Sequence, residues 1–202
     1  SSIRNGRGFF SDYWLGSVLG TRRKVQGPRL TSSQAQRLLR RLVQLRQRVD
    51  VAEPLPAADF RERYARPILG DLFGYVITED GGDPQVRLLV RADNPGDSRK
   101  TLAAALLLPD QEELEARSTR GCIDRALTEH GFRYGFILTP DVLRLVRRPG
   151  EGAKNAYFDL SLATAAESED LESLALAYQI LCAEIFTPGP DGTRAIDLLE
   201  EE

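Results

Sequence analysis

Hydrophobic residues spaced three or four positions apart predict helices in several parts of the chain. The segment that follows TSSQ (residues 31–34) shows the pattern best, because it opens on a capping-box sequence and repeats apolar residues on one face. Those residues are Ala35, Leu38, Leu42, Leu45 and Val49. The same spacing predicts helices in GFFSDYWLGSVLG (8–20), from about 57 to 73, from about 112 to 130 with Gly131 as a stop signal, and from 171 to 186.

Short apolar runs between these helices predict strands. They are VRLLVR (86–91), residues 101–108, YGFILT (134–139), VLRLVR (142–147) and NAYFDLSL (155–162). The turn-rich ADNPGDSRK joins the first two, and Pro140 with Asp141 suits a tight turn between the third and fourth. The alternation of helices and strands predicts an α/β (α+β) fold in which helices flank a small mixed sheet.

Breaks in this pattern divide the chain into three parts. EPLP (53–56) ends a helical N-terminal segment, 1–56, and an α/β domain follows at 57–187. The turn-rich TPGPDGTR (187–194) opens a linker, 188–202. We expect this linker to join a following domain, because IDLLEEE begins like a new helix.

The composition is that of an ordinary globular protein, with 202 residues, 42% hydrophobic and 28% charged. No apolar run approaches the roughly 20 residues of a membrane span, so we expect no membrane partner. Cys122 and Cys182 fall in apolar helical patterns, which favours two reduced core thiols over a disulfide. A cytoplasmic setting is the expectation that follows.

The net charge of −3 gives no general reason to expect nucleic-acid binding, but arginines crowd the first 50 residues. Three basic groups are candidates for DNA phosphate contacts, which need only positive charge within reach. They are Arg22, Arg23 and Lys24; the helical stripe Arg37, Arg41 and Arg48; and the trio Arg144, Arg147 and Arg148. Two alternatives stay open: a solvated face on arginine-rich helices, or docking of the stripe on an acidic surface of the same protein.

Motifs for other chemistry are missing from the sequence. His130 is the only histidine, and with two separated cysteines it gives no metal-ligand spacing and no catalytic triad. DNPG (93–96) begins like the Asn-Pro-Pro-aromatic signature of adenine methyltransferases but lacks the second proline and the aromatic ring. We therefore assign no catalytic residue, no metal and no cofactor to this segment.

Several stretches resemble the N-terminal region of large type IIG-like restriction–modification proteins. They are ERYARPILGDLFGY, HGFRYGFILTPDVLRLVRR, AYFDLSLATA and AYQILCAEIFTPG. Relatives of those proteins serve in phage-defence systems such as BREX and DISARM, and they carry an adenine-specific DNA methyltransferase further along the chain. The order of elements between about Phe60 and Phe186 also resembles the restriction-endonuclease fold, PD-(D/E)XK. Here Pro-Asp replaces the Asn-Gly of the family's hairpin, and its tryptophan is missing.

The nuclease fold implies an acid-x-lysine pair on one strand and an acid on the strand before it, which together hold Mg²⁺. If Pro109 marks the end of this motif, the pair falls on Leu106 and Leu108, and the preceding acid falls near Arg87 or Leu88. None of these side chains binds a metal, so the resemblance implies a degenerate nuclease site. A rearranged site would draw on Asp93, Asp97, Glu112, Glu62 and Lys100.

The resemblance therefore implies a non-catalytic N-terminal domain of a restriction–modification or phage-defence methyltransferase. Its expected work is to act as a scaffold that packs on the methyltransferase region of the same chain, contacts double-stranded DNA or recruits defence-system subunits. S-adenosylmethionine is implied for the parent protein only. Two alternatives are an active Mg²⁺-dependent endonuclease domain with a rearranged site, and a protein-interaction module that makes no DNA contact.

Overall fold

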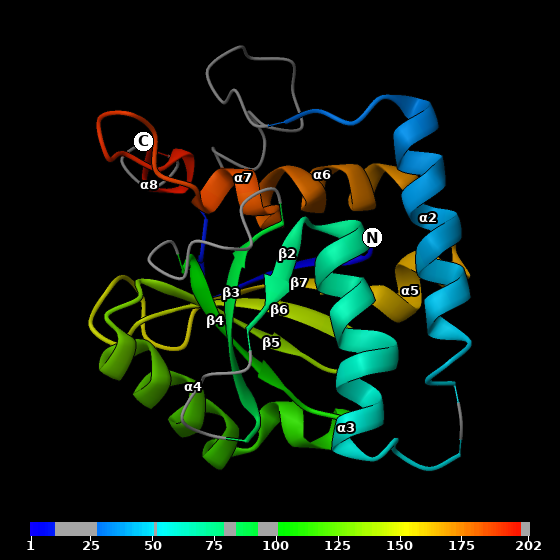
Figure 1. Cartoon of the computed structure of the whole chain (residues 1–202), viewed down its shortest axis with the longest axis horizontal. Coiled ribbons are helices and arrows are strands. Elements are labelled where there is room, and N and C mark those ends of the chain that lie inside the picture. The colour runs from blue at the N-terminus through cyan, green and yellow to red at the C-terminus, as the bar shows by residue number, and fades with distance from the viewer. Residues whose placement is uncertain (11–27, 51, 79–83, 93–100, 199–202) are drawn as a thin grey trace.

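A single mixed sheet of seven strands organises the described part of the chain, which in this computed structural model comprises residues 1–10, 28–50, 52–78, 84–92 and 101–198. The strands are β1 (Ile3–Gly6), β2 (Tyr75–Ile77), β3 (Val86–Arg91), β4 (Ala103–Leu107), β5 (Tyr134–Leu138), β6 (Val142–Arg147) and β7 (Tyr157–Ser161). They lie in the order β1-β7-β6-β5-β4-β3-β2 (Figure 1). Only β4 and β5 pair in parallel, and the other neighbours are antiparallel.

Helices cover both faces of this sheet. They are α2 (Ser32–Arg46), α3 (Ala57–Phe60), the π-helical turns η1 (Arg61–Ala65) and η2 (Ile68–Leu72), the 3-10 turn η4 (Gln111–Glu115), α4 (Arg117–His130), α5 (Leu162–Glu167), α6 (Leu171–Leu181), α7 (Ala183–Phe186) and α8 (Ala195–Leu198). The helix α4 packs on β4 and β5, whereas α2 packs on η2, α5 and α6 on the other side of the molecule (Figure 1). The predicted fold class, a mixed sheet flanked by helices, is confirmed.

The apolar residues of β4 serve two hydrophobic cores at once. Ala104 and Leu106 belong to the core beneath α4, and Ala103, Ala105 and Leu107 belong to the larger core on the opposite face. Successive side chains of a strand point to opposite faces. A central strand that is covered on both sides therefore needs apolar residues throughout, which is why β4 reads as an unbroken apolar run.

The parallel pair β4 and β5 is joined by α4, and two glycines shape this crossover. Gly131 ends the helix in the left-handed conformation, with φ of 72°, as the sequence predicts. Gly135 on β5 lies so close to α4 that an added Cβ would come within 2.7 Å of the Leu127 side chain and 3.1 Å of the Ala104 carbonyl oxygen. The close approach of helix and strand therefore depends on the missing side chain at Gly135.

Two predicted helices are less regular than their periodicity suggests. The helix at 57–73 forms, but it includes the π-helical turns η1 and η2 on either side of Pro67. The final helix breaks at Cys182, whose backbone is extended, so that α6 and α7 are separate. Hydrogen bonds hold this break, because the Tyr75 hydroxyl donates to the Leu181 carbonyl at 2.7 Å and the Ala183 amide donates to the Phe73 carbonyl at 2.8 Å.

The N-terminal residues complete the sheet. β1 pairs antiparallel with β7 over Ile3–Gly6, so the segment at 1–56, predicted to be helical, also contributes a strand. Ser2 anchors this strand, since its amide and hydroxyl donate to Asp170 at 3.1 and 2.9 Å. The helix predicted for GFFSDYWLGSVLG falls mostly outside the described residues. The capping box at Thr31 is confirmed, with both of its reciprocal hydrogen bonds present.

Candidate functional site

Leu106 and Leu108, the positions implied for a nuclease acid and lysine, are core residues. Their side chains are 0% and 2% exposed and pack in the hydrophobic cluster beneath α4. Leu106 lies opposite Val86 on β3 and Ile137 on β5, two further apolar residues. Arg87 and Leu88 lie opposite Ala105 and Ala104. Because β4 carries no charged side chain on either face, it offers no oxygen ligand for a metal from its side chains.

Of the side chains considered for a rearranged nuclease site, the structure describes Glu62 and Glu112. Asp93, Asp97 and Lys100 lie outside the described residues. Glu62 forms ion pairs with Arg61 and Arg66, both at 2.9 Å, and these hydrogen bonds, that from Arg66 first, lower the pKa of its carboxyl. Glu112 is exposed on η4. Among the described residues, no three or more histidine, cysteine or acidic side chains are grouped to hold a metal ion.

Arg144, one of the predicted phosphate ligands, is buried on β6 with 7% of its surface exposed. Its guanidinium donates to both carboxylate oxygens of Asp159 at 2.8 and 2.9 Å, and to Glu115 at 2.8 Å. The same guanidinium lies 4.0 Å from the ring centre of Tyr157. Burial alone would lower the pKa of Arg144, but the hydrogen bonds to Asp159 and Glu115 outweigh it and raise the pKa. The charged guanidinium of Arg144 therefore lies inside the fold, where its N–H groups are bonded to carboxylates of the protein itself.

Arg147 and Arg148 also make contacts within the fold. The Arg147 guanidinium stacks over the ring of Phe9, 3.9 Å from its centre, and donates to the Phe9 carbonyl. Arg148 forms an ion pair with Glu151 at 2.6 Å. Arg147 therefore anchors the N-terminal segment, while the half-buried Arg148 is the member of the trio that borders a cavity, described below.

The arginine stripe of α2 faces away from the helix's buried side. Ala35, Leu39, Leu42 and Leu45 are the buried residues of α2. Arg37 is exposed, and Arg41 forms an ion pair with Asp71 at 2.7 Å. Arg48 is exposed and donates to the Arg63 carbonyl at 2.9 Å. Arg22, Arg23 and Lys24 lie outside the described residues.

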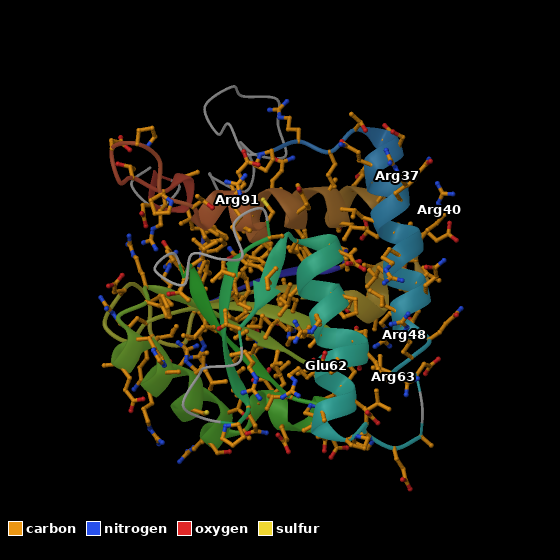
Figure 2. All side chains as sticks on the ribbon, viewed as in Figure 1. Arg37, Arg40, Arg48, Glu62, Arg63 and Arg91 are labelled. Atoms are coloured by element: carbon orange, nitrogen blue, oxygen red, sulfur yellow. The ribbon has the colours of Figure 1, made fainter. Side chains whose placement is uncertain are left out.

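Two further arginines extend this stripe. Arg40 on α2 and Arg63 on η1 are exposed beside the members predicted from the sequence, and Figure 2 shows Arg37, Arg40, Arg48 and Arg63 along one side of the molecule. Within the described part of the chain, Arg37 and Arg40 form no ion pair. We call Arg37, Arg40, Arg48 and Arg63 the α2 arginine surface. The helical spacing used for the predicted stripe left out Arg40, and Arg63 joins the surface beside Arg48, which donates to its carbonyl.

A second basic feature is a cavity of about 900 Å³ at the end of the sheet where β3 and β6 end and β4 and β5 begin. Four arginines line it: Arg91, Arg133, Arg148 and Arg194. They come from four separate parts of the chain, so no sequence motif groups them. Only Arg148 was among the predicted candidates.

The remaining candidate side chains have structural surroundings. His130 is exposed at the end of α4 and stacks against Phe132, with ring centres 6.0 Å apart. Cys122 and Cys182 are both free thiols, and burial raises the pKa of Cys182 to about 11. Within the described residues, no helix is both long and apolar enough to cross a bilayer. No protein-family model, curated protein or solved structure matches the chain.

Proposed function

We propose that this chain is a non-catalytic domain of a DNA-modifying restriction or phage-defence protein, and that it contacts the backbone of double-stranded DNA through the α2 arginine surface. The proposal depends on two features found together. The central strand β4 is entirely apolar, and the exposed arginines of the α2 arginine surface lie on and beside an outer helix. The first leaves the strand without metal ligands, and the second supplies charge for phosphate.

The apolar strand supports a scaffold role. A Mg²⁺ site needs several oxygen ligands around one point. The side chains of Leu106 and Leu108 instead fill the space between β4 and α4, where they stabilise the fold. In a protein of this kind, any chemistry is expected from another domain, and the sequence resemblance points to a methyltransferase that uses S-adenosylmethionine in a cytoplasmic setting.

The arrangement of the α2 arginine surface suits a phosphate backbone. Arg37 lies on α2 and Arg48 in the turn just after it, and the part of α2 from Arg37 to its last residue, Arg46, spans roughly 14 Å along the helix axis. That length matches the rise of about four base pairs of DNA, so several phosphates of one strand come within reach. Guanidinium groups bind phosphate oxygens in a bidentate manner, independently of base sequence.

Binding of a fluorescent DNA duplex, followed by anisotropy at several salt concentrations, tests this surface. We expect micromolar or weaker affinity that falls as salt rises, with no sequence preference. The double variant Arg37→Glu/Arg40→Glu should reduce the slope of log K against log salt by about 2, since each lost phosphate contact removes nearly one unit.

A matched control reverses two exposed arginines elsewhere. Arg117→Glu/Arg125→Glu makes the same change of net charge on α4, on the other side of the sheet from α2. Unchanged binding with this variant and weakened binding with the α2 variant is the expected result. Equal weakening by both variants, or no duplex binding at all, would remove DNA from the proposal and favour a protein-interaction module.

A cleavage assay tests the non-catalytic part. The purified protein should leave plasmid DNA intact with either Mg²⁺ or Mn²⁺. Metal-dependent cleavage that disappears in Asp93→Ala or Glu112→Ala would show an active nuclease with a rearranged site, and the scaffold proposal would then be abandoned.

A further inference from the structure

Another cavity, of about 410 Å³, lies between α4 and the part of the sheet formed by β6 and β7. Its volume falls within the roughly 300 to 1,000 Å³ that small-molecule sites occupy. We call it the α4 cavity. It shares no lining residue with the larger cavity bordered by Arg148 and Arg194, so the two are separate.

Two arginines on the lining of the α4 cavity keep their charge available for a ligand. Arg7 follows β1, Arg117 is the first residue of α4, and both are exposed. Within the described part of the chain, neither side chain forms an ion pair or a hydrogen bond, and the same holds for the exposed amide of Asn155 on this lining. A ligand can therefore meet two guanidinium groups and one amide without breaking an existing interaction.

The other charged side chains of this lining are paired with each other. Arg120 contacts Asp124 at 2.8 Å, and Arg144 contacts Glu115 at 2.8 Å. We assign these two arginines no part in binding a ligand's charge, because their carboxylate partners already neutralise them.

The positive charge of Arg7 and Arg117 is left over after this pairing. Asp159, the buried partner of Arg144, lies opposite Arg4 on β1, so a further arginine accompanies that carboxylate. The α4 cavity therefore carries an excess of about two positive charges among the described residues, which favours a ligand with two negative charges.

Two lining residues also have an unusual backbone. Among the described non-glycine residues, Arg7, Asn155 and Glu169 have a positive φ, and the first two, at 55° and 58°, both border the α4 cavity. Asparagine tolerates this left-handed conformation, but an arginine rarely adopts it. The turn after β1 thus presents Arg7 to the cavity at some cost in stability.

Gly121 on α4 completes the wall. Glycine weakens a helix, and packing does not require it here, because an added Cβ would meet no atom within 4 Å. Its missing side chain instead keeps part of the cavity open and exposes the helix backbone to it. Glycine is the residue that allows a backbone to approach a ligand closely.

A phosphate monoester carried on a sugar fits these features. Such a phosphate has a charge of about −1.5 to −2 at pH 7, which matches the two arginines, and guanidinium groups bind phosphate oxygens in a bidentate manner. The amide of Asn155 both donates and accepts hydrogen bonds, as sugar hydroxyls do. A phosphate ion alone would leave most of the roughly 410 Å³ unfilled.

We propose that the α4 cavity binds a sugar phosphate, with the phosphate against Arg7 and Arg117 and the sugar hydroxyls against Asn155. The sugar phosphate is either a free pentose phosphate or the ribose phosphate of a mononucleotide. The proposal does not depend on DNA binding, because α4 and the α2 arginine surface lie on opposite sides of the sheet (Figure 1). It describes a binding site and includes no reaction of the ligand.

Isothermal titration calorimetry with ribose 5-phosphate, ribose and inorganic phosphate, run without added metal, tests the proposal. We expect ribose 5-phosphate to bind, ribose to show no binding, and inorganic phosphate to bind at least tenfold more weakly because it lacks the sugar. A titration with AMP identifies the source of the sugar phosphate. Tighter binding than ribose 5-phosphate supports a mononucleotide, and weaker binding supports a free pentose phosphate.

Four variants test the assigned residues. Arg7→Ala and Arg117→Ala should each weaken the binding of ribose 5-phosphate by roughly tenfold or more, the effect of losing a charged hydrogen bond. Arg117→Lys, which keeps the charge but loses the bidentate geometry, should bind with an affinity between those of the wild type and Arg117→Ala. Gly121→Leu should abolish binding by filling the cavity, without lowering the thermal stability, because leucine forms helices better than glycine.

The matched control is Arg125→Leu, which removes an arginine and adds a leucine on the same helix, at an exposed position outside the α4 cavity. This variant, and Arg37→Glu/Arg40→Glu, should bind ribose 5-phosphate as the wild type does. The proposal fails if neither ribose 5-phosphate nor AMP binds, or if ribose or inorganic phosphate binds equally well. It also fails if Arg125→Leu costs as much affinity as Arg117→Ala, or if folded Gly121→Leu binds like the wild type.

Discussion

Arg144 and Asp159 are direct cross-strand partners on β6 and β7, and two parallel hydrogen bonds of 2.8 and 2.9 Å join their side chains. Both residues are buried. A bidentate pair of this kind, with Glu115 and the Tyr157 ring completing the surroundings of the guanidinium, is structural. The basic sequence VLRLVR thus contributes a charge to the interior of the protein rather than to its surface.

Removing one member of this pair should destabilise the protein strongly. Arg144→Leu leaves the Asp159 carboxylate buried without its partner, and we expect the free energy of unfolding at pH 7 to fall by about 3–5 kcal/mol. Burial already raises the pKa of Asp159, and the loss of Arg144 removes the hydrogen bonds that oppose this rise. A protonated carboxyl needs no counter-charge, so the deficit should shrink as the pH is lowered toward about 4. Urea denaturation at pH 7 and pH 4 measures both effects.

The double variant Arg144→Leu/Asp159→Leu provides the control for that prediction. With both charges gone, no buried ion remains, and the variant should be more stable than Arg144→Leu alone. A double variant that is less stable by the sum of the two single losses would show that the pair is not coupled.

Asp170 connects the start of α6 to the N-terminal strand. Its carboxylate accepts hydrogen bonds from the Ser173 amide at 3.0 Å and from Ser2. Burial alone would raise the pKa of Asp170, but these hydrogen bonds lower it from 3.8 to about 2. Asp170→Ala should therefore reduce the free energy of unfolding at pH 7 by about 1–2 kcal/mol.

The pH dependence at Asp170 has a definite sign. Because the pKa in the folded state is lower than in the unfolded state, the stabilisation is complete above about pH 4 and is lost as the pH falls toward 2. The stability difference between the wild type and Asp170→Asn should accordingly narrow between pH 4 and pH 2. A constant difference over that range would show that the charge of Asp170 contributes nothing.

Leu106 tests whether the nuclease-like position is core. Leu106→Asp places a carboxylate where the side chain is fully buried, and we expect a loss of more than about 3 kcal/mol or a failure to fold. Arg87→Asp, at a half-buried position on the adjacent strand, should cost much less. Similar thermal stability of the two variants would instead indicate a solvated cleft at Leu106.

Two glycines near α4 should respond in opposite directions to the same substitution. Gly135→Ala adds a methyl group within 2.7 Å of Leu127 and should cost about 1–3 kcal/mol through overpacking. Gly121→Ala, on α4 itself, meets no atom within 4 Å and should stabilise the protein by about 0.5–1 kcal/mol. Thermal denaturation of both variants measures this contrast, and a stable Gly135→Ala protein would show that α4 can move away from β5.

Elements could be predicted from the sequence where burial against the core leaves a regular spacing of hydrophobic residues. The helix α2, the strands β3 to β7 and the end of α4 at Gly131 are confirmed. They could be predicted because each has a strong period or a specific terminal residue. The strand β1 was missed, since Ile3–Gly6 is short and mostly polar, and it becomes a strand through pairing with β7. The strand β2, three residues long, gives too little sequence for a period to appear.

The candidate sites depended more on tertiary structure. The exposed face of α2 follows from helical spacing, so Arg37 and Arg48 could be predicted as surface residues. The same reasoning did not separate Arg144 from them, because its acidic partners Asp159 and Glu115 are distant in the sequence. The cavity arginines could not be grouped at all, as they meet only where the ends of several strands converge.

The pairing of β1 with β7 also affects how the protein is made. Ile3 lies opposite Leu160, so this strand leaves the ribosome long before its partner exists. At roughly 5 to 20 residues per second of translation, the wait lasts about 8 to 30 s. Because this short segment contains Asn5 and Gly6, which have low strand propensity, we expect it to stay unpaired until β7 has emerged.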